Sequence, residues 1–396
     1  MGPAPVTRLF LIAGEPSGDA LGGALMAGLK TLSPGVEFHG VGGPLMQAEG
    51  LDSLFPMDEL SVMGIAEVLP RYRALMRRIA QCADAVVAMQ PDALITIDSP
   101  DFGLRVARRV KAASPIRTVH YVAPTVWAWR PQRAAKMAEV IDQVLALFPF
   151  EPTYMEAEGM RCDFVGHPVV AEPLASPEQA AAFRAAHGIA SDTRLILALP
   201  GSRAGEVARL APIFGQALQE VLARHPSARV VVPAAPAVAA DVARLIEGWP
   251  GAPVLLDPRG QSAEVAAAEK RAAFAAADAA LAASGTVSLE LAANGVPMVI
   301  AYDMNWLSRK IIGRMLRLDT VTLVNIVSET RAVPEFLGAA CKPGPIGAAL
   351  AGLMEDDTAR TAQRDAARLT MTRLGQGGEA PGLRAARAVL EGLAAE

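Results

Sequence analysis

Short apolar runs alternate with longer stretches of helical periodicity along the whole chain. In the first half, Arg8–Ala13 and Ala93–Asp98 have the pattern of buried strands, whereas Ala20–Leu32 and Phe102–Ala113 have that of helices. Apolar strands that alternate with helices are typical of parallel sheets covered by helices on both faces. The pattern therefore predicts an α/β protein.

The alternation stops at the proline-rich stretch Pro168–Pro177 and then restarts, with a strand at Arg194–Leu199 and a helix at Glu206–Arg224. A chain of 396 residues has room for two domains of ordinary size. We therefore expect two Rossmann-like domains facing a cleft, residues 1–170 and residues 171–396, the second with a helical tail. Ligands of such sheets bind beyond the carboxyl ends of the strands.

One strand–loop–helix–strand unit in the second half carries a candidate anion site. Its loop, Ser284-Gly285-Thr286, precedes a helix that Gly295 ends. A helix start offers unpaired N–H groups to a phosphate, and Glu290, one turn later, is placed to accept hydrogen bonds from a ribose. A capped helix with a solvated glutamate explains the same pattern.

A second loop of this kind, Gly201-Ser202-Arg203, also follows a strand and opens a helix. The forked guanidinium of Arg203 suits phosphate oxygens. The alternative is a surface ion pair between Arg203 and Glu206. Because both loops are expected at equivalent strand ends of one sheet, they are candidates for the same donor nucleotide.

The first half offers a candidate general base and a polar loop. Asp98 ends a strand at the ligand side of the sheet, although it could instead cap the next helix, for which Asp101 is the better candidate. Glu15, Ser17 and Asp19 follow the first strand, and Glu15 and Ser17 are candidate residues of the acceptor side. Their alternative role is to cap the helix that begins near Ala20.

The stretch Val62–Ala80 mixes apolar residues with arginines and holds one acid, Glu67. Such a mixture suits an anionic lipid surface or an acylated substrate, although a core helix with a solvated basic face is the alternative. Pro70 is expected to interrupt the helix, and Trp306–Arg317 repeats the chemistry. The candidate acceptor and membrane residues here are Val62, Met63, Ile65, Val68, Leu69, Arg71, Arg73, Leu75, Met76 and Arg77.

The composition of the chain limits the functional classes to which the protein can belong. A net charge of −4 argues against a general nucleic-acid binder. The three cysteines and five histidines are scattered, so no metal site is expected and a reducing compartment is favoured. There is no glycine-rich dinucleotide fingerprint, P-loop or Asp-x-Asp pair. No signal peptide or membrane-spanning run is apparent, which predicts a cytoplasmic protein, at most peripheral on a membrane.

Several stretches together resemble the lipid-A-disaccharide synthase family. They are AGEPSGD (13–19), MGIAEVL (63–69), IDSPDF (97–102), HYVAPTVWAWR (120–130), FVGHP (164–168), LPGSR (199–203) and ASGTVSLE (283–290). The resemblance extends over most of the chain. One departure is Val324, which stands where a proline is expected before Asn325.

This resemblance implies a GT-B fold and transfer of 2,3-diacylglucosamine from its UDP donor to 2,3-diacylglucosamine 1-phosphate (lipid X). It also implies that no cofactor or metal takes part and that the enzyme is peripheral on the anionic inner membrane. In that chemistry Asp98 is our expected base, and Arg203 with the Ser284–Thr286 loop stabilises the leaving diphosphate. Glu290 holds the ribose, and Asn325 adds a donor-side hydrogen bond.

Three other functions stay open on the sequence alone. A UDP-sugar 2-epimerase of the same fold would use a similar glutamate, and another lipid-linked glycosyltransferase, such as the peptidoglycan enzyme, would share most of the pattern. A non-catalytic UDP-sugar sensor would bind the donor without turnover. The helical tail is compatible with a homodimer in which the tail is exchanged.

Overall fold

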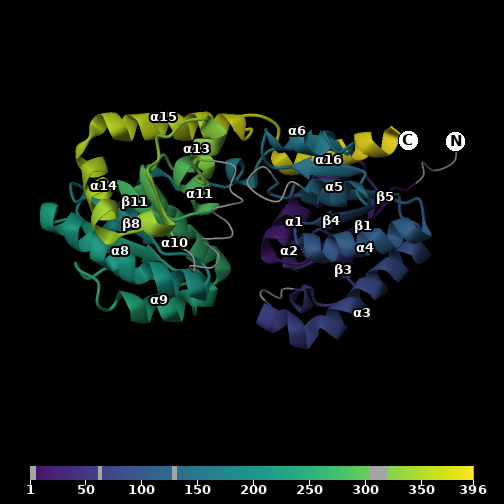
Figure 1. Ribbon diagram of the computed structural model, residues 1–396, viewed down its shortest axis with the longest axis horizontal. Coiled ribbons are helices and arrows are strands. Elements are labelled where there is room, and N and C mark those ends of the chain that lie inside the picture. Colours follow the sequence, from purple (N-terminus) through teal and green to yellow (C-terminus); the bar gives the residue numbers. More distant parts are fainter. Residues whose placement is uncertain (1–5, 61–64, 127–131, 304–318, 396) are drawn as a thin grey trace. The chain divides into compact units, whose positions relative to one another are not determined.

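The computed structural model describes residues 6–60, 65–126, 132–303 and 319–395, with only the backbone of residues 65–71. The chain forms two compact units, and Figure 1 labels their helices and strands. The first unit consists of Met1–Ala171 and Leu374–Glu396, and the second of Glu172–Arg373. Each unit has its own parallel sheet, which confirms the predicted pair of Rossmann-like domains.

The sheet of the first unit has seven strands in the order β3-β2-β1-β4-β5-β6-β7, and every adjacent pair is parallel. The strands are β1 (Arg8–Ala13), β2 (Glu37–Val41), β3 (Asp52–Ser53), β4 (Ala93–Ile97), β5 (Arg117–Tyr121), β6 (Gln143–Ala146) and β7 (Arg161–Phe164). The helices are α1 (Pro16–Leu32), α2 (Pro44–Ala48), α3 (Ile65–Met89), α4 (Pro100–Ala113), α5 (Gln132–Ala138), α6 (Glu151–Glu156) and α16 (Pro381–Ala394). Two 3₁₀ turns, η1 (Met57–Glu59) and η2 (Pro168–Val170), complete the unit.

The second unit has six strands in the order β10-β9-β8-β11-β12-β13, again parallel throughout. They are β8 (Leu195–Leu199), β9 (Arg229–Pro233), β10 (Val254–Leu256), β11 (Ala279–Ala283), β12 (Met298–Tyr302) and β13 (Glu335–Leu337). The helices are α7 (Pro177–Ala186), α8 (Ala204–Arg224), α9 (Ala239–Ile246), α10 (Ala263–Ala276), α11 (Val287–Ala293), α13 (Leu323–Ser328), α14 (Pro343–Glu355) and α15 (Asp357–Arg373), with 3₁₀ turns η3 (Pro236–Val238) and η4 (Gly338–Ala340).

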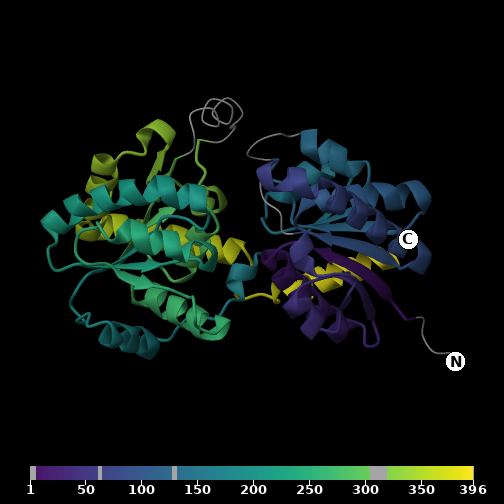
Figure 2. The ribbon, with the colours of Figure 1, turned by 90° about the horizontal axis from the view of Figure 1, so that it is seen from below.

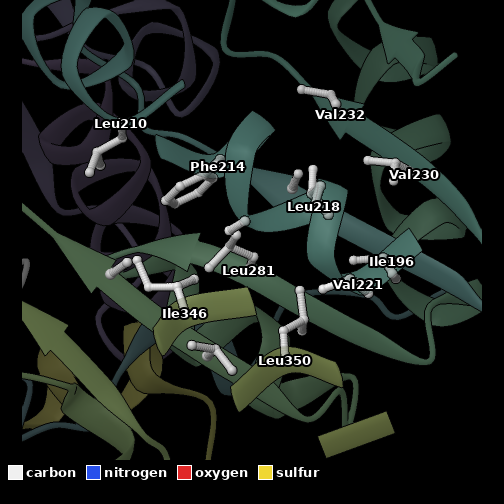
Figure 3. Packing of buried hydrophobic residues seen from close by; sticks show 14 of the residues in the cluster. Ile196, Leu210, Phe214, Leu218, Val221, Val230, Val232, Leu281, Ile346 and Leu350 are labelled. Atoms are coloured by element: carbon white, nitrogen blue, oxygen red, sulfur yellow. The ribbon is translucent and has the colours of Figure 1, made fainter. Parts of the chain in front are cut away.

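The core of the second unit lies where α8 and α14 pack on the sheet. Phe214 and Leu218 on α8 contribute to the same buried cluster as Leu281 on β11 and Leu350 on α14 (Figure 3). The buried positions of α8 recur every three or four residues, so one stripe of the helix faces the strands. This packing fixes where α8 begins, and hence the position of the loop before it.

Strand order reverses once in each sheet, between β1 and β4 in the first unit and between β8 and β11 in the second. The connections that follow β1 and β4 therefore leave on opposite sides of the sheet and create a crevice at its carboxyl edge. The same holds for β8 and β11. Each of the loops predicted to carry chemistry follows one of these four strands.

The predicted linker is only partly irregular. Helix α7 begins at Pro177 and is preceded by a capping box, in which Ser176 and Gln179 bond reciprocally to each other's backbone N–H groups. Arg184 on α7 binds Asp278 at 2.9 Å and the carbonyl oxygen of Ala276 at 2.6 Å. These bonds attach α7 to the rest of the second unit. The sequence analysis predicted no helix at these residues.

The prediction that residues 171–396 form one domain is wrong at its C-terminal end, because α16 packs against α1 of the first unit (Figures 1 and 2). The two helices approach closely at glycines: a β-carbon on Gly28 would lie 2.7 Å from the carbonyl oxygen of Gly382. The side chain of Gln143 on β6 also donates to the carbonyl oxygen of Ala388 at 2.9 Å. No periodicity within α16 reveals which sheet it covers.

Pro70 does not interrupt the basic-apolar stretch, since α3 runs without a break from Ile65 to Met89. The expectation of a broken helix was wrong because Pro70 lies in the second turn, where it removes one helical hydrogen bond near the helix start. Among the residues described, no helix is both long and apolar enough to cross a bilayer.

We predict that Gly28→Ala lowers the free energy of unfolding by about 1–3 kcal/mol, because the new methyl group is forced against the backbone of α16. Gly352→Ala in α14 is the matched control, since a β-carbon there meets no atom within 4 Å. That control should be neutral or stabilising, because alanine favours a helix. Equal unfolding midpoints in urea for the two variants would contradict the close packing of α1 and α16.

Candidate active site

The carboxyl edge of the first sheet carries two adjacent short loops. Gly14 and Glu15 join β1 to α1, and Asp98 and Ser99 join β4 to α4. Each helix has a proline in its first turn, where the missing N–H costs no helical bond. The prolines thus begin both helices directly after the strands and place the loops side by side at the point where strand order reverses.

Asp98 has a fixed orientation. Its backbone φ is 52° and that of Ser99 is 41°, both in the left-handed region. The Asp98 N–H donates to the carbonyl oxygen of Tyr121 on β5 at 2.9 Å. The carboxylate accepts the Ser99 N–H at 2.9 Å and the Ser17 hydroxyl at 3.2 Å. Asp98 is half-buried, so its carboxylate combines a defined position with access from solvent.

Helix capping does not explain Asp98. Ser99 occupies the N-cap position of α4, and no side chain caps that helix. Asp101, expected as the better cap, lies within the first turn. The carboxylate of Asp98 therefore serves another purpose than closing the helix, which favours the functional interpretation.

The polar loop after β1 divides into different roles. Asp19 is buried and accepts the backbone N–H groups of Gly43, Leu45 and Met46 at 2.9–3.0 Å, so it holds the start of α2. Glu15 is half-buried at the N-cap position of α1, where no side-chain capping bond forms. Ser17 does not cap α1 either, and the capping interpretation of this loop was wrong.

A buried polar pair that the sequence analysis did not single out lies beneath Asp98. The Nδ1 atom of His120 on β5 is 2.7 Å from the hydroxyl of Thr96 on β4. Complete burial lowers the pKa of His120 to about 4, so the imidazole is neutral at physiological pH. The position of His120 in the HYVAP stretch was the available signal, and its contact with Thr96 joins the adjacent strands β4 and β5.

In the second unit, the Gly201–Arg203 loop is organised by Glu206. Gly201 has φ 123°, and a β-carbon on it would lie 2.8 Å from that of Glu206. Glu206 accepts the Ser202 N–H at 3.3 Å and the Tyr302 hydroxyl at 3.4 Å. Burial and the neighbouring Glu206 charge raise the pKa of Tyr302. Tyr302, at the end of β12, was missed by the sequence analysis.

Arg203 occupies the N-cap position of α8, and its side chain is 65% exposed. Its guanidinium lies 3.7 Å from the Glu206 carboxylate. The ion pair predicted as the alternative to phosphate binding is therefore present. An exposed pair of this length is worth little, so it orients Arg203 without occupying its donors.

Across the reversal in strand order, the Ser284–Thr286 loop joins β11 to α11. Gly285 has φ 150° and is exposed, and a β-carbon on it would meet nothing within 4 Å, so the backbone here is open to a ligand. Glu290 on α11 is bound by Lys270 of α10 at 2.5 Å. The glutamate is therefore not simply solvated, and Lys270 is a partner that sequence spacing did not reveal.

Asn325, predicted to contact the donor, is instead 1% exposed. Its amide nitrogen donates to the carbonyl oxygen of Val333 at 2.9 Å, with the hydroxyl of Thr320 and the carboxylate of Glu335 also within 3.3 Å. Its amide oxygen accepts the Val333 N–H at 3.0 Å. In this arrangement Asn325 ties α13 to the start of β13, and its amide hydrogens are already used.

The described part of the basic-apolar stretch presents cations to solvent. Tyr72, Arg73 and Arg77 are exposed, and Leu75 and Met76 are half-buried. Arg78 is different: it forms a bidentate pair with Glu59 at 2.7 and 2.8 Å and lies 4.2 Å from the centre of the Phe55 ring. The described part of this stretch is thus neither entirely buried in the core nor entirely exposed to solvent. Val62, Met63, the side chains of Ile65, Val68, Leu69 and Arg71, and the Trp306–Arg317 repeat lie outside the description.

No group of three or more histidine, cysteine, aspartate or glutamate side chains in the described part of the chain could hold a metal ion. The first unit therefore carries a carboxylate at its strand-order reversal, and the second unit carries an arginine and an open glycine loop at its own reversal.

Residues 9–381 match the family model described as lipid-A-disaccharide synthetase. The chain is 65% identical to the lipid-A-disaccharide synthase of Ruegeria pomeroyi, over 99% of this chain and 98% of that one. It is 48% identical to the enzyme of the same name from Rhodospirillum centenum, over 96% of this chain and 94% of that one.

Solved structures share the fold at low sequence identity. A UDP-GlcNAc 2-epimerase from Neisseria meningitidis, bound to UDP-GlcNAc, has a TM-score of 0.63 at 13% identity, covering 99% of this chain and all of the other. MurG from Acinetobacter baumannii has a TM-score of 0.56 at 13% identity, covering 99% of this chain and all of the other. These likenesses confirm the GT-B architecture.

Proposed function

Since the chain belongs to the lipid-A-disaccharide synthase family and is a glycosyltransferase of lipid A biosynthesis, we propose that it transfers 2,3-diacylglucosamine from UDP to lipid X. The product is a β-1,6-linked disaccharide 1-phosphate, and UDP is released. The observation that carries the proposal is the placement of complementary groups at the two strand-order reversals: Asp98 in one unit, and Arg203 with the Ser284–Thr286 loop in the other.

The proposed reaction is one in-line displacement. The 6-hydroxyl oxygen of lipid X attacks the anomeric carbon, the bond from that carbon to the β-phosphate oxygen of UDP breaks, and the hydroxyl proton passes to Asp98. An α-linked donor that yields a β-linked product inverts the anomeric carbon, which a single displacement achieves. A half-buried carboxylate with a fixed orientation suits the base in such a step.

The leaving diphosphate develops negative charge as the glycosidic bond breaks. Arg203 offers a planar fork of donors to it, and Glu206 lies 3.7 Å from the guanidinium without occupying those donors. The open backbone around Gly285 contributes N–H groups on the other side. We therefore assign the diphosphate to these two loops and propose that no metal is required.

The nucleoside half of the donor lies further into the second unit in this proposal. Glu290 accepts hydrogen bonds from the ribose hydroxyls, and Lys270, which donates to its carboxylate at 2.5 Å, orients it. The 2-epimerase with a similar fold is related at a level that supports the architecture only, and an assay with donor alone, in which an epimerase would turn over, separates the two activities.

Both substrates carry acyl chains, so we propose that the enzyme works peripherally on an anionic membrane. The exposed Arg73 and Arg77 on α3, beside the exposed Tyr72, support this assignment. Arg78 is excluded from it, because its guanidinium is bound by Glu59 and Phe55.

We predict that Asp98→Asn lowers kcat by at least about a hundredfold, because an amide cannot take the proton. UDP binding, measured by calorimetry, and the thermal melting temperature should change little. Asp101→Asn, an exposed position in the first turn of the same helix, is the control and should keep normal turnover. Near-normal kcat in a folded Asp98→Asn enzyme would remove Asp98 as the base.

Arg203→Ala should raise the KM for the donor and lower kcat together, since the arginine contacts the diphosphate in the ground state and in the transition state. Arg203→Lys should restore activity only in part, because a point charge lacks the fork. Arg244→Ala in α9, also an exposed ion-paired arginine, is the control.

The proposal that no metal is required is tested by assaying the wild-type enzyme in EDTA, where it should keep its activity. Activity that is lost in EDTA and restored by Mg²⁺ would contradict the metal-free step.

For the membrane assignment, we predict that Arg73→Gln with Arg77→Gln lowers the partition coefficient onto anionic vesicles about 30-fold. This corresponds to about 1 kcal/mol for each arginine near the surface. Arg244→Gln with Arg368→Gln, exposed arginines of the second unit, removes the same charge and should leave sedimentation nearly unchanged. Equal pelleting of the two double variants would argue against α3 as the membrane-facing element.

A further inference from the structure

Ser17 has an unusual use for a serine at the start of a helix. It is the second residue of α1, yet no side chain caps that helix. Its hydroxyl instead crosses to the end of the neighbouring strand and donates to Oδ2 of Asp98 at 3.2 Å. A serine in this position ordinarily bonds to nearby backbone, so the bond to another loop requires a separate explanation.

The second oxygen of the Asp98 carboxylate is held independently. Oδ1 accepts the N–H of Ser99 at 2.9 Å. That N–H is aimed at the carboxylate because Asp98 and Ser99 both have left-handed backbone angles, a conformation that costs energy for residues other than glycine. The hydrogen bond from the Asp98 N–H to the carbonyl oxygen of Tyr121 attaches the turn formed by Asp98 and Ser99 to β5.

Gly14 leaves space for the turn formed by Asp98 and Ser99. A β-carbon at Gly14 would lie 2.8 Å from the hydroxyl oxygen of Ser99, closer than a real contact allows. The absence of a side chain at the end of β1 therefore lets the two loops pack against each other. This close packing brings the start of α1, and with it Ser17, within hydrogen-bonding distance of the carboxylate.

We propose that Ser17 is a positioning residue for Asp98 in the transfer step, an inference that rests on the proposed function of Asp98 as the base. One donor on each carboxylate oxygen fixes the rotation of the side chain. An ionised carboxylate has about four lone-pair directions, so after it accepts two hydrogen bonds about two remain, and one of these can take the proton of the acceptor hydroxyl. Ser17 thus acts through Asp98 and does not itself react.

The competing explanation is that Ser17 is a surface tether between α1 and the β4 loop. The two roles differ in what they change. A tether affects the stability of the first unit, whereas a positioning residue affects kcat and leaves the KM for the donor and the melting temperature unchanged.

The test compares Ser17→Ala, Ser17→Thr and Ser33→Ala. Ser17→Ala should lower kcat about tenfold, equivalent to about 1.4 kcal/mol, with an unchanged KM for the donor and an unchanged melting temperature. Ser17→Thr keeps the hydroxyl and should recover most of the lost kcat. Ser33→Ala removes a hydroxyl at the opposite end of the same helix and should behave as the wild type.

A double variant separates this inference from the function on which it rests. In an Asp98→Asn background, Ser17→Ala should cause no further loss, because the two residues act as one unit. A further tenfold loss would overturn the positioning role. Normal kcat in Ser17→Ala, with Asp98→Asn inactive, would overturn the Ser17 inference alone; an active Asp98→Asn enzyme would overturn both.

Discussion

The reversal of strand order in each sheet is the constraint on which the rest of the structure depends. All strands are parallel, so every connection must cross over the sheet through a helix. Crossovers on opposite sides separate at β1 and β4, and again at β8 and β11, which opens the carboxyl edge at those two points. Asp98, Arg203, the Ser284–Thr286 loop and Glu290 each follow one of these four strands or lie in the helix that begins there.

Four acidic side chains near these edges show how local contacts assign different roles to one chemical group. Asp19 is buried and takes three backbone N–H groups, so it builds the loop before α2. Glu206 and Glu290 are each paired with a cation in the second unit, Arg203 and Lys270 respectively. Asp98 is held by two neutral donors, and within the described part of the chain no ion pair to it is found.

Which segments of the chain form the first unit depends on helix α16. The chain leaves that unit after Ala171 and returns to it at Leu374. Close approach of α1 and α16 requires glycine at 28 and 382, because any side chain there would meet main-chain atoms of the other helix. Two glycines more than three hundred positions apart in the sequence thus allow α16 to pack on the first unit. The composition and periodicity near the C-terminus do not indicate this contact.

The sequence by itself determined the two Rossmann-like units, the strand ends that bear Asp98 and Arg203, and the family. These are local properties, because apolar runs, glycine loops and helix starts are encoded within about ten residues. Only the tertiary structure decided that Lys270 binds Glu290, that Asn325 is buried, that α16 rejoins the first unit and that Ser17 bonds to Asp98. Each of these joins residues on different elements, and their meeting depends on packing that a one-dimensional pattern does not contain.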